Sequence, residues 1–231
     1  TYQPRIIERD NLQTLFDALS KSGHQLLGPT IQNNAVVLDE IGTVEDLPIG
    51  VVDRQDGGTY RLEDAGTPTC FGYVVGPQSW KKYFHLPQVT LWKATRDGKS
   101  FAVEESAEHG SKRALIGVRA CDLAALDIHD KVLTAGPYAD SIYRRMRQNV
   151  FIVAVNCTRA GGTWFCASMG TGPKATSGYD LVLTELAGNG RHIFIAEPGS
   201  KAGAKLLEQL PTQSCSGDDL ATATAAIDRV T

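Results

Sequence analysis

Hydrophobic residues in the middle of the chain form two short continuous runs with a helical pattern between them. Residues 113–118 (RALIGV) and 150–155 (VFIVAV) are almost entirely apolar, as strands buried on both faces of a parallel sheet are. Between them, apolar residues recur at helical spacing from Leu123 to Gly136. The order strand, helix, strand predicts a βαβ unit with parallel strands and a right-handed crossover.

The flanking regions predict more strands and helices. The expected helices cover residues 10–22, 79–84, 200–210 and 218–230, and Asp10-Asn-Leu-Gln13 at the first of them has the form of a capping box. The expected strands cover residues 24–28, 34–41, 59–62, 71–77, 88–94, 100–105, 179–186 and 192–196. Together these elements predict an α/β fold: a mixed sheet with a central parallel βαβ unit flanked by helices, plus a smaller N-terminal α+β portion.

Shifts in composition suggest how the chain is divided. Residues 42–70 are rich in Gly, Pro and Asp and show little periodicity, which indicates a surface loop region. We therefore expect an N-terminal α+β portion over residues 1–70 and a central α/β domain over 71–210. Residues 211–231 are expected to form a helix that leads out of this domain.

Composition excludes some classes of function. The chain has 231 residues, 42% of them hydrophobic, and its 23 Lys+Arg against 26 Asp+Glu leave no basic excess for a nucleic-acid interface. Its apolar runs are far shorter than the roughly 20 residues that span a bilayer. The first residues show no charged segment followed by an apolar one, so no signal peptide is visible. We expect a cytoplasmic protein.

Three of the five cysteines follow the predicted βαβ strands. Cys121 and Cys157 come just after the two apolar runs, and parallel strands end at one edge of the sheet, where open α/β folds bind ligands. Gly161-Gly162 allows the next loop to fold back and bring Cys166 to that edge. Thiolates gathered in this way favour a soft metal or an iron–sulfur cluster. The spacing matches no zinc-ribbon or ferredoxin motif, so burial of ordinary free thiols stays open.

Five segments carry a family resemblance. They are residues 47–50, 71–80, 117–126, 156–173 and 178–181. In these segments the chain resembles the beta subunits of soluble nickel–iron sulfhydrogenases and the 4Fe-4S electron-transfer subunit of anaerobic sulfite reductase, over about residues 45 to 210. The resemblance implies a cytoplasmic 4Fe-4S electron-transfer subunit of an oxidoreductase complex. Its partners would be a catalytic hydrogenase or sulfite reductase subunit, together with a flavin- and NAD(P)-binding electron-transfer subunit.

The resemblance also implies a ligand set. Cys121, Cys157 and Cys166 would be metal ligands, and Asp122, Gly161, Gly162 and Trp164 would line the cofactor. Relatives carry a cysteine where this chain has Trp164, so the cluster either keeps three thiolates, with Asp122, water or a substrate at the fourth iron, or is lost. Relatives also continue into a C-terminal ferredoxin-like part with two cubane clusters, to which residues 211–231 would lead. Cys70 and Cys215 are expected to be unconnected to the site.

Other interpretations stay open beside the electron carrier. A cluster-free scaffold that only docks a catalytic partner would use the same fold, and a thiol enzyme would need one cysteine of depressed pKa. Gly170-Thr-Gly-Pro-Lys174 could form a backbone nest for an anion. His129 is the one histidine placed to approach the cysteines, although its position along the helix favours a structural role.

Overall fold

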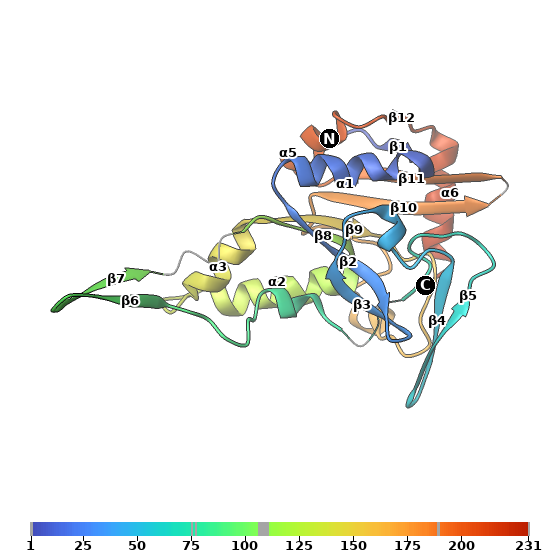
Figure 1. The fold of residues 1–231 in the computed structure, drawn as a ribbon. Helices are drawn as coiled ribbons and strands as arrows, with labels where there is room; N and C mark the ends of the chain where they lie inside the picture. Colours follow the sequence, from blue (N-terminus) through green and yellow to red (C-terminus); the bar gives the residue numbers. More distant parts are fainter. Residues whose placement is uncertain (1, 75, 77, 106–110, 189, 231) are drawn as a thin grey trace.

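One twisted mixed sheet organises the molecule (Figure 1), which we describe from a computed structural model. The structure describes residues 2–74, 76, 78–105, 111–188 and 190–230. Within them, eight strands join in the order β12-β1-β11-β10-β9-β8-β2-β3. The four strands β2, β8, β9 and β10 run parallel to one another, and the outer strands pair antiparallel. Two separate hairpins, β4–β5 and β6–β7, lie outside this sheet.

The strands of the main sheet are short and come from the whole length of the chain. They are β1 Arg5–Glu8, β2 Gln25–Gln32, β3 Ala35–Glu40, β8 Arg113–Val118, β9 Val150–Val155, β10 Leu181–Gly188, β11 Arg191–Pro198 and β12 Gln213–Ser214. The hairpin strands are β4 Val51–Asp56, β5 Thr59–Asp64, β6 Trp92–Asp97 and β7 Ser100–Glu105.

Six α-helices accompany the strands within the described residues. They are α1 Leu12–Lys21, α2 Ala120–Thr134, α3 Ser141–Gln148, α4 Cys166–Met169, α5 Lys201–Leu207 and α6 Gly217–Asp228, and short 3-10 turns occupy Arg9–Asn11, Val44–Asp46 and Trp80–Tyr83. In the part of the chain that the structure describes, no helix combines the length and the apolar character needed to cross a membrane.

The alternation of side chains along the central strands divides the core into two layers. Phe151, Val153 and Val155 of β9 face the layer covered by α1 and α5, whereas Ile152 and Ala154 face the layer covered by α2 and α3. Figure 1 shows these helix pairs on opposite sides of the sheet. Both faces of the central strands are therefore buried, which explains why their sequences are almost continuously apolar.

The predicted α/β class and its central unit are confirmed. β8 and β9 occupy residues 113–118 and 150–155, pair in parallel and are joined through α2. A tight turn joins β2 to β3, with Asn33 and Asn34 at φ values of 51° and 58°. Positive φ at both central residues suits the right-handed twist of a two-residue hairpin. The expected three-part division of the chain remains a prediction.

Two local predictions are wrong. Asp10 does not cap the first helix, because residues 9–11 form a 3-10 turn and α1 begins at Leu12 without a side-chain cap. Residues 71–77 are not a strand in their described positions. The N–H groups of Phe71 and Val74 bond instead to the carboxylates of Glu185 and Asp53, so this segment is held by buried side chains rather than by a neighbouring strand.

Several elements carry too weak a pattern to be predicted. β1 and β12 have four and two residues, and β4 lies in the polar stretch that reads as a loop. α3 (SIYRRMRQ) buries only Tyr143 and Met146, and its Asp140 cap accepts hydrogen bonds from Ile142 N and Tyr143 N at 2.9 Å. Two buried residues in eight are too few to show a helical period in the sequence.

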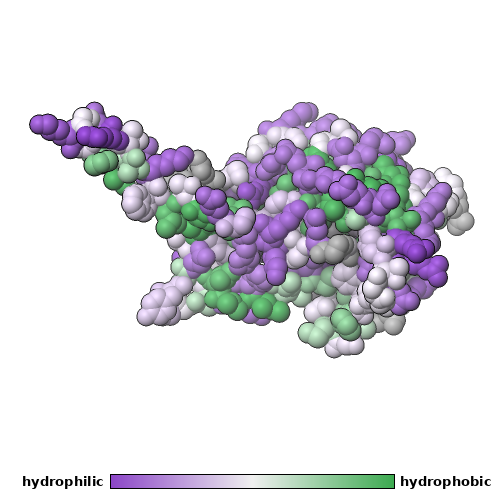
Figure 2. Space-filling view, turned by 60° about the horizontal axis from the view of Figure 1, so that its bottom comes forward, coloured by the Kyte–Doolittle hydropathy of each residue, from purple (hydrophilic) through white to green (hydrophobic). Residues whose placement is uncertain are grey.

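The β6–β7 hairpin projects from the body as an arm (Figures 1 and 2). Trp92, Ala94 and Val103 lie on one of its faces with Phe101, because Trp92 pairs with Glu105, Ala94 with Val103 and Arg96 with Phe101. Trp92, Val103 and Phe101 are 61%, 63% and 68% exposed. An isolated two-stranded hairpin is marginally stable in water, so this arm contributes little to the stability of the body.

Candidate functional site

Three cysteines from different parts of the chain line one cavity. Cys121 is in the first turn of α2, Cys157 follows β9, and Cys166 begins the short helix α4. All three side chains are partly buried and line a cavity of about 100 Å³ together with Arg119 and Trp164. Because β8 and β9 are parallel, Cys121 and Cys157 share the carboxyl edge of the sheet. Whether these cysteines are metal ligands remains a prediction.

A buried arginine, Arg119, lines this cysteine cavity. Arg119 is 3% exposed, and its Nη2 donates to the backbone oxygens of Phe71 at 2.8 Å and Tyr73 at 2.9 Å. Its Nη1 lies 3.4 Å from Asn156 O and 4.0 Å from Cys157 Sγ. Arg119 Nε has no hydrogen-bond partner among the described residues. A full positive charge is therefore fixed directly beside one of the three sulfurs.

Burial keeps two of the thiols protonated. It raises the pKa of Cys121, which the neighbouring Asp122 and Cys166 raise further. Burial also raises the pKa of Cys157, and the Arg119 guanidinium counteracts part of that shift. Neither thiol has the depressed pKa of a nucleophile, so these two thiols give the thiol-enzyme hypothesis no support.

The spacing of the sulfurs differs from that of a single-ion site. Four thiolates around one zinc ion lie about 3.8 Å apart, given Zn–S bonds of about 2.3 Å in a tetrahedron. Cys121, Cys157 and Cys166 are not among the groups of described residues whose ligand atoms all lie within 4.8 Å of one another. At least one pair of these sulfurs therefore lies farther apart than one tetrahedral ion requires, whereas Cys121 and Cys166 are within hydrogen-bond reach of each other.

Two glycines allow the loop after Cys157 to close on the cavity. A Cβ at Gly161 would lie 2.1 Å from Trp164 Cδ1, and one at Gly162 would lie 2.6 Å from the backbone oxygen of Gln55. The Trp164 indole packs on Gly161 and has an Nε1 without a hydrogen-bond partner among the described residues. The structure thus gives Gly161 and Gly162 a packing role, and their contact with a cofactor remains a prediction.

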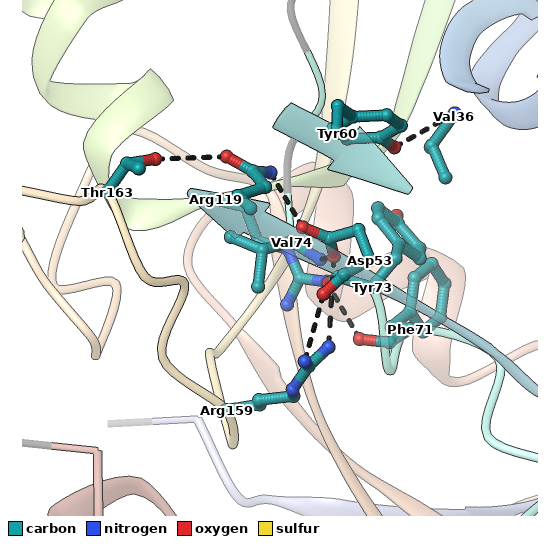
Figure 3. A network of polar contacts seen from close by, with 10 residues as sticks. Val36, Asp53, Tyr60, Phe71, Tyr73, Val74, Arg119, Arg159 and Thr163 are labelled. Atoms are coloured by element: carbon teal, nitrogen blue, oxygen red, sulfur yellow. Dashed lines mark hydrogen bonds and ion pairs between the residues drawn. The ribbon is translucent and has the colours of Figure 1, made fainter. Parts of the chain in front are cut away.

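An ion pair ties the same loop to β4 (Figure 3). Arg159 Nη2 donates to Asp53 O at 2.9 Å, and Nη1 lies 3.8 Å from Asp53 Oδ1. Asp53 is 2% exposed and also accepts hydrogen bonds from Val74 N and from Gln55 Nε2. Thr163 Oγ1 donates to Gln55 Oε1 at 3.1 Å. The β4–β5 hairpin therefore forms an outer support for the cysteine loop.

Asp122 is used at the start of α2. Its Oδ2 accepts the backbone N–H of Arg119 at 3.0 Å, which satisfies a donor at the helix N-terminus. Burial raises the pKa of Asp122 to about 6. Asp122 does not line the cavity together with the cysteines, so its role toward a cofactor remains a prediction.

The remaining candidates lie elsewhere. His129 Nδ1 is 2.9 Å from His85 Nε2, in a pair that links α2 to the turn at residues 80–83, and neither histidine lines the cysteine cavity. Lys174 and Gly170 line a different cavity of about 570 Å³, where Asp127 and Asp130 are also present. The anion nest at residues 170–174 remains a prediction. Cys215 lies near α6, outside the cysteine cavity.

Sequence reasoning missed a second cluster of ligating groups. Cys70, Glu185 and His192 bring a sulfur, a carboxylate oxygen and a ring nitrogen within 4.8 Å of one another. The sequence shows no close Cys–His pair, because these residues come from separate parts of the chain. The detectable signal is Glu185 itself, a charged residue inside the otherwise apolar run of β10.

Comparison with known proteins gives one curated relative. The chain is 34% identical over 130 residues to the protein named sulfhydrogenase 2 subunit beta of Pyrococcus furiosus (strain ATCC 43587 / DSM 3638 / JCM 8422 / Vc1). The resemblance to sulfhydrogenase beta subunits is confirmed. The matched region covers 55% of this chain and 36% of the relative, so the chain spans about a third of the relative's length. No protein-family model matches the chain. No solved structure matches it significantly either.

Proposed function

We propose that this chain is the cysteine-bearing α/β part of an electron-transfer subunit, and that Cys121, Cys157 and Cys166 hold a 4Fe-4S cluster. The observation that carries the proposal is the convergence of three thiols on one cavity beside a buried arginine. Such a cluster, when bound, accepts and releases single electrons. The three cysteines would ligate the cluster, and the residues around it would set its reduction potential and exclude water.

The donor set suits a cluster better than a single ion. Thiolates are soft ligands that select iron–sulfur clusters, zinc or copper(I). At least one pair of the sulfurs here is too far apart for one tetrahedral ion, whereas a cubane separates its ligands across its whole width. Both Cys121 and Cys157 must lose their thiol protons on binding, so uptake of iron should be favoured by higher pH.

Arg119 supplies the electrostatics of the site. Its charge is fixed by two carbonyl hydrogen bonds and cannot be lost, because guanidinium stays protonated in proteins. A buried positive charge 4.0 Å from Cys157 Sγ favours the thiolate form and, with a cluster bound, favours the more negative, reduced state. We therefore assign Arg119 as a residue that raises the reduction potential.

The proposal extends to partners and place. The relative is named as a beta subunit of a sulfhydrogenase, so we infer that this chain works within a multi-subunit hydrogenase or sulfite reductase complex. It would take electrons from, or return them to, a flavin- and NAD(P)-binding subunit in the cytoplasm. The exposed apolar arm β6–β7 is compatible with assembly into a larger complex.

One observation favours a cluster-free docking domain instead. Trp164 fills the place where the resemblance leads us to expect a fourth cysteine, and its ring packs closely against Gly161. In that case the three thiols would be buried small residues, and the surface alone would bind the catalytic partner.

Anaerobic reconstitution with iron and sulfide distinguishes the two. We expect about four iron and four sulfide per chain and a broad visible absorption that dithionite bleaches. Replacing Cys121, Cys157 or Cys166 by Ser should each remove most of the iron, whereas Cys215→Ser is the matched control and should not. Trp164→Cys should raise iron occupancy and slow its loss in air.

The outcomes separate the alternatives. A chain that folds but binds no iron, with or without Trp164→Cys, supports the docking domain and contradicts the electron carrier. Equal iron loss from the Cys215 control would show that the bound iron is unspecific. Iron that depends on the three cysteines but not on position 164 would place the fourth ligand elsewhere.

A further inference from the structure

A second group of ligating side chains includes Glu185, which binds the same backbone segment as Arg119. Cys70 is fully buried, Glu185 is 6% exposed and His192 is half-buried. One potential ligand atom from each lies within 4.8 Å of the other two. None of the three lines the cysteine cavity, so this group is a separate feature of the protein.

The sheet fixes two of these side chains. In the antiparallel pair β10–β11, Ala187 pairs with His192 and Glu185 with Phe194, so Glu185 and His192 are diagonal neighbours on one face. His192 Nε2 lies 2.7 Å from Glu185 Oε1. Rigid strands hold both groups in place, which favours a preorganised site.

The third side chain arrives on the irregular segment that crosses this face. Cys70 N donates to Glu185 Oε1 at 2.6 Å, and Phe71 N donates to Glu185 Oε2 at 2.8 Å. These bonds hold the Cys70 thiol over the Glu185–His192 pair. Without an ion, burial raises the pKa of Cys70 to about 12, so the free thiol is protonated and unreactive.

We propose that Cys70, Glu185 and His192 form a binding site for one divalent cation of the zinc class, independent of the cluster site. A thiolate, an imidazole and a carboxylate are ligands that zinc takes in proteins, and three protein ligands leave one position open. The two negative ligands balance the charge of the ion, so the buried site becomes neutral overall. Neutrality removes the main cost of placing an ion in this core.

Metal binding also changes the protonation of the Cys70 and His192 side chains. The metal forms bonds to Cys70 Sγ, His192 Nε2 and a Glu185 oxygen. The Cys70 thiol proton is released, and His192 must keep a proton on Nδ1 only and give up its hydrogen bond to Glu185. Affinity should therefore increase with pH.

A neighbouring cation moderates the affinity. Arg9 lies close enough to Cys70 to influence its pKa, and Arg9 Nη2 is 3.4 Å from Glu45 Oε1. Its charge, only partly balanced by Glu45, repels a second cation nearby. Arg9 also lowers the pKa of Cys70 and so favours the thiolate that binds the ion, which opposes this repulsion.

Cobalt(II) is the probe for the experiment, because its bond to a thiolate gives a charge-transfer band and its d–d bands report coordination number. The titration uses the full chain with Cys121, Cys157 and Cys166 all replaced by Ser, which leaves Cys70 and Cys215 as the only thiols. We expect one cobalt ion per chain with a thiolate band. Cys70→Ser in this background should abolish the band, and Cys215→Ser should leave it unchanged.

His192 provides a test that does not depend on altered cysteines. His192→Ala in the otherwise unchanged chain retains the bonds from Glu185 to residues 70 and 71, so the fold has its main support. Native mass spectrometry with zinc should show one ion on the parent chain, and at least about 10-fold weaker binding in the variant. Glu185→Gln should weaken it similarly.

Either result can overturn the site. A cobalt band that survives Cys70→Ser, or zinc binding that is unchanged in His192→Ala, would show that these residues are not ligands. Absence of any stoichiometric ion on the parent would do so too. Reconstituted iron content should be the same in the parent and in His192→Ala, so failure of this site and failure of the cluster proposal are distinguishable.

Discussion

Two buried charges of opposite sign hold the same short segment. Glu185 accepts hydrogen bonds from the backbone N–H groups of Cys70 and Phe71, and Arg119 donates to the backbone oxygens of Phe71 and Tyr73. The cysteine cavity thus contains the guanidinium of Arg119, whereas the group of Cys70, Glu185 and His192 is centred on the carboxylate of Glu185. A cavity with a permanent positive charge suits thiolates that carry an anionic cluster, and a carboxylate-centred cluster suits a cation.

The two regions share the backbone segment of residues 70–73. No hydrogen bond or ion pair joins Arg119 to Glu185 within the described residues, and both bind the backbone of residues 70–73. Buried polar groups are costly unless they form hydrogen bonds. The backbone groups of the segment stabilise each charge, and both charges hold the segment in place. Loss of either charge should therefore lower the free energy of unfolding.

Removal of the anion should have the largest effect. Glu185→Ala leaves the N–H groups of Cys70 and Phe71 without their acceptor and removes the partner of His192. We expect a loss of about 3–5 kcal/mol in the free energy of unfolding, measured by urea denaturation of the metal-free protein. Glu208→Ala, at an exposed position after α5, is the control and should change stability by less than about 0.5 kcal/mol. Equal losses of unfolding free energy in the two variants would show that Glu185 does not hold this segment in place.

Removal of the cation should cost less. Arg119→Met takes the donors away from two carbonyl groups, but it also removes a charge that is expensive to bury. Buried carbonyl groups tolerate loss of a partner better than N–H groups do. We expect about 2–3 kcal/mol of destabilisation in the same urea experiment. A loss larger than that of Glu185→Ala would reverse the order of the two charges.

The second arginine at the cavity should matter least for stability. The Arg159 side chain is 41% exposed, and its ion pair with Asp53 spans 3.8 Å, so solvent screens the interaction. Arg159→Ala should lower the free energy of unfolding by less than about 1 kcal/mol. Because Arg159 ties the cysteine loop to β4, limited proteolysis within residues 158–165 should nevertheless become faster. Unchanged proteolysis would show that Gln55 and Thr163 suffice to hold the loop.

The sequence predicts the central fold because its signals there are redundant. Val150–Val155 is apolar throughout, and the helical pattern before it leaves little choice but a parallel βαβ unit. The same reasoning failed for residues 71–77, which are equally apolar. The backbone groups of Phe71, Tyr73 and Val74 bond to Asp53, Arg119 and Glu185, and no local pattern reveals that distant charges will replace a neighbouring strand.

The candidate site was predictable only as far as the strand ends fix it. Cys121 and Cys157 follow strands whose pairing is evident, so their shared edge could be expected. The burial of Arg119 could not, because an arginine before a helix is normally exposed and its partners lie in a segment with no regular structure. Glu185 and His192 meet only through the register of β10 and β11, and Cys70 joins them through the hydrogen bonds of Cys70 N and Phe71 N to Glu185.

The order of strands in the main sheet has a consequence for how the chain acquires its structure. β1 pairs with β11, with Arg5 beside Ala196 and Ile7 beside Phe194. During synthesis β1 therefore has no β11 partner until nearly two hundred further residues have been made, and the side chains that it buries in the folded protein stay exposed during that time. Such non-local pairing slows folding and exposes the nascent chain to aggregation. The four residues of β1 keep that exposed surface small.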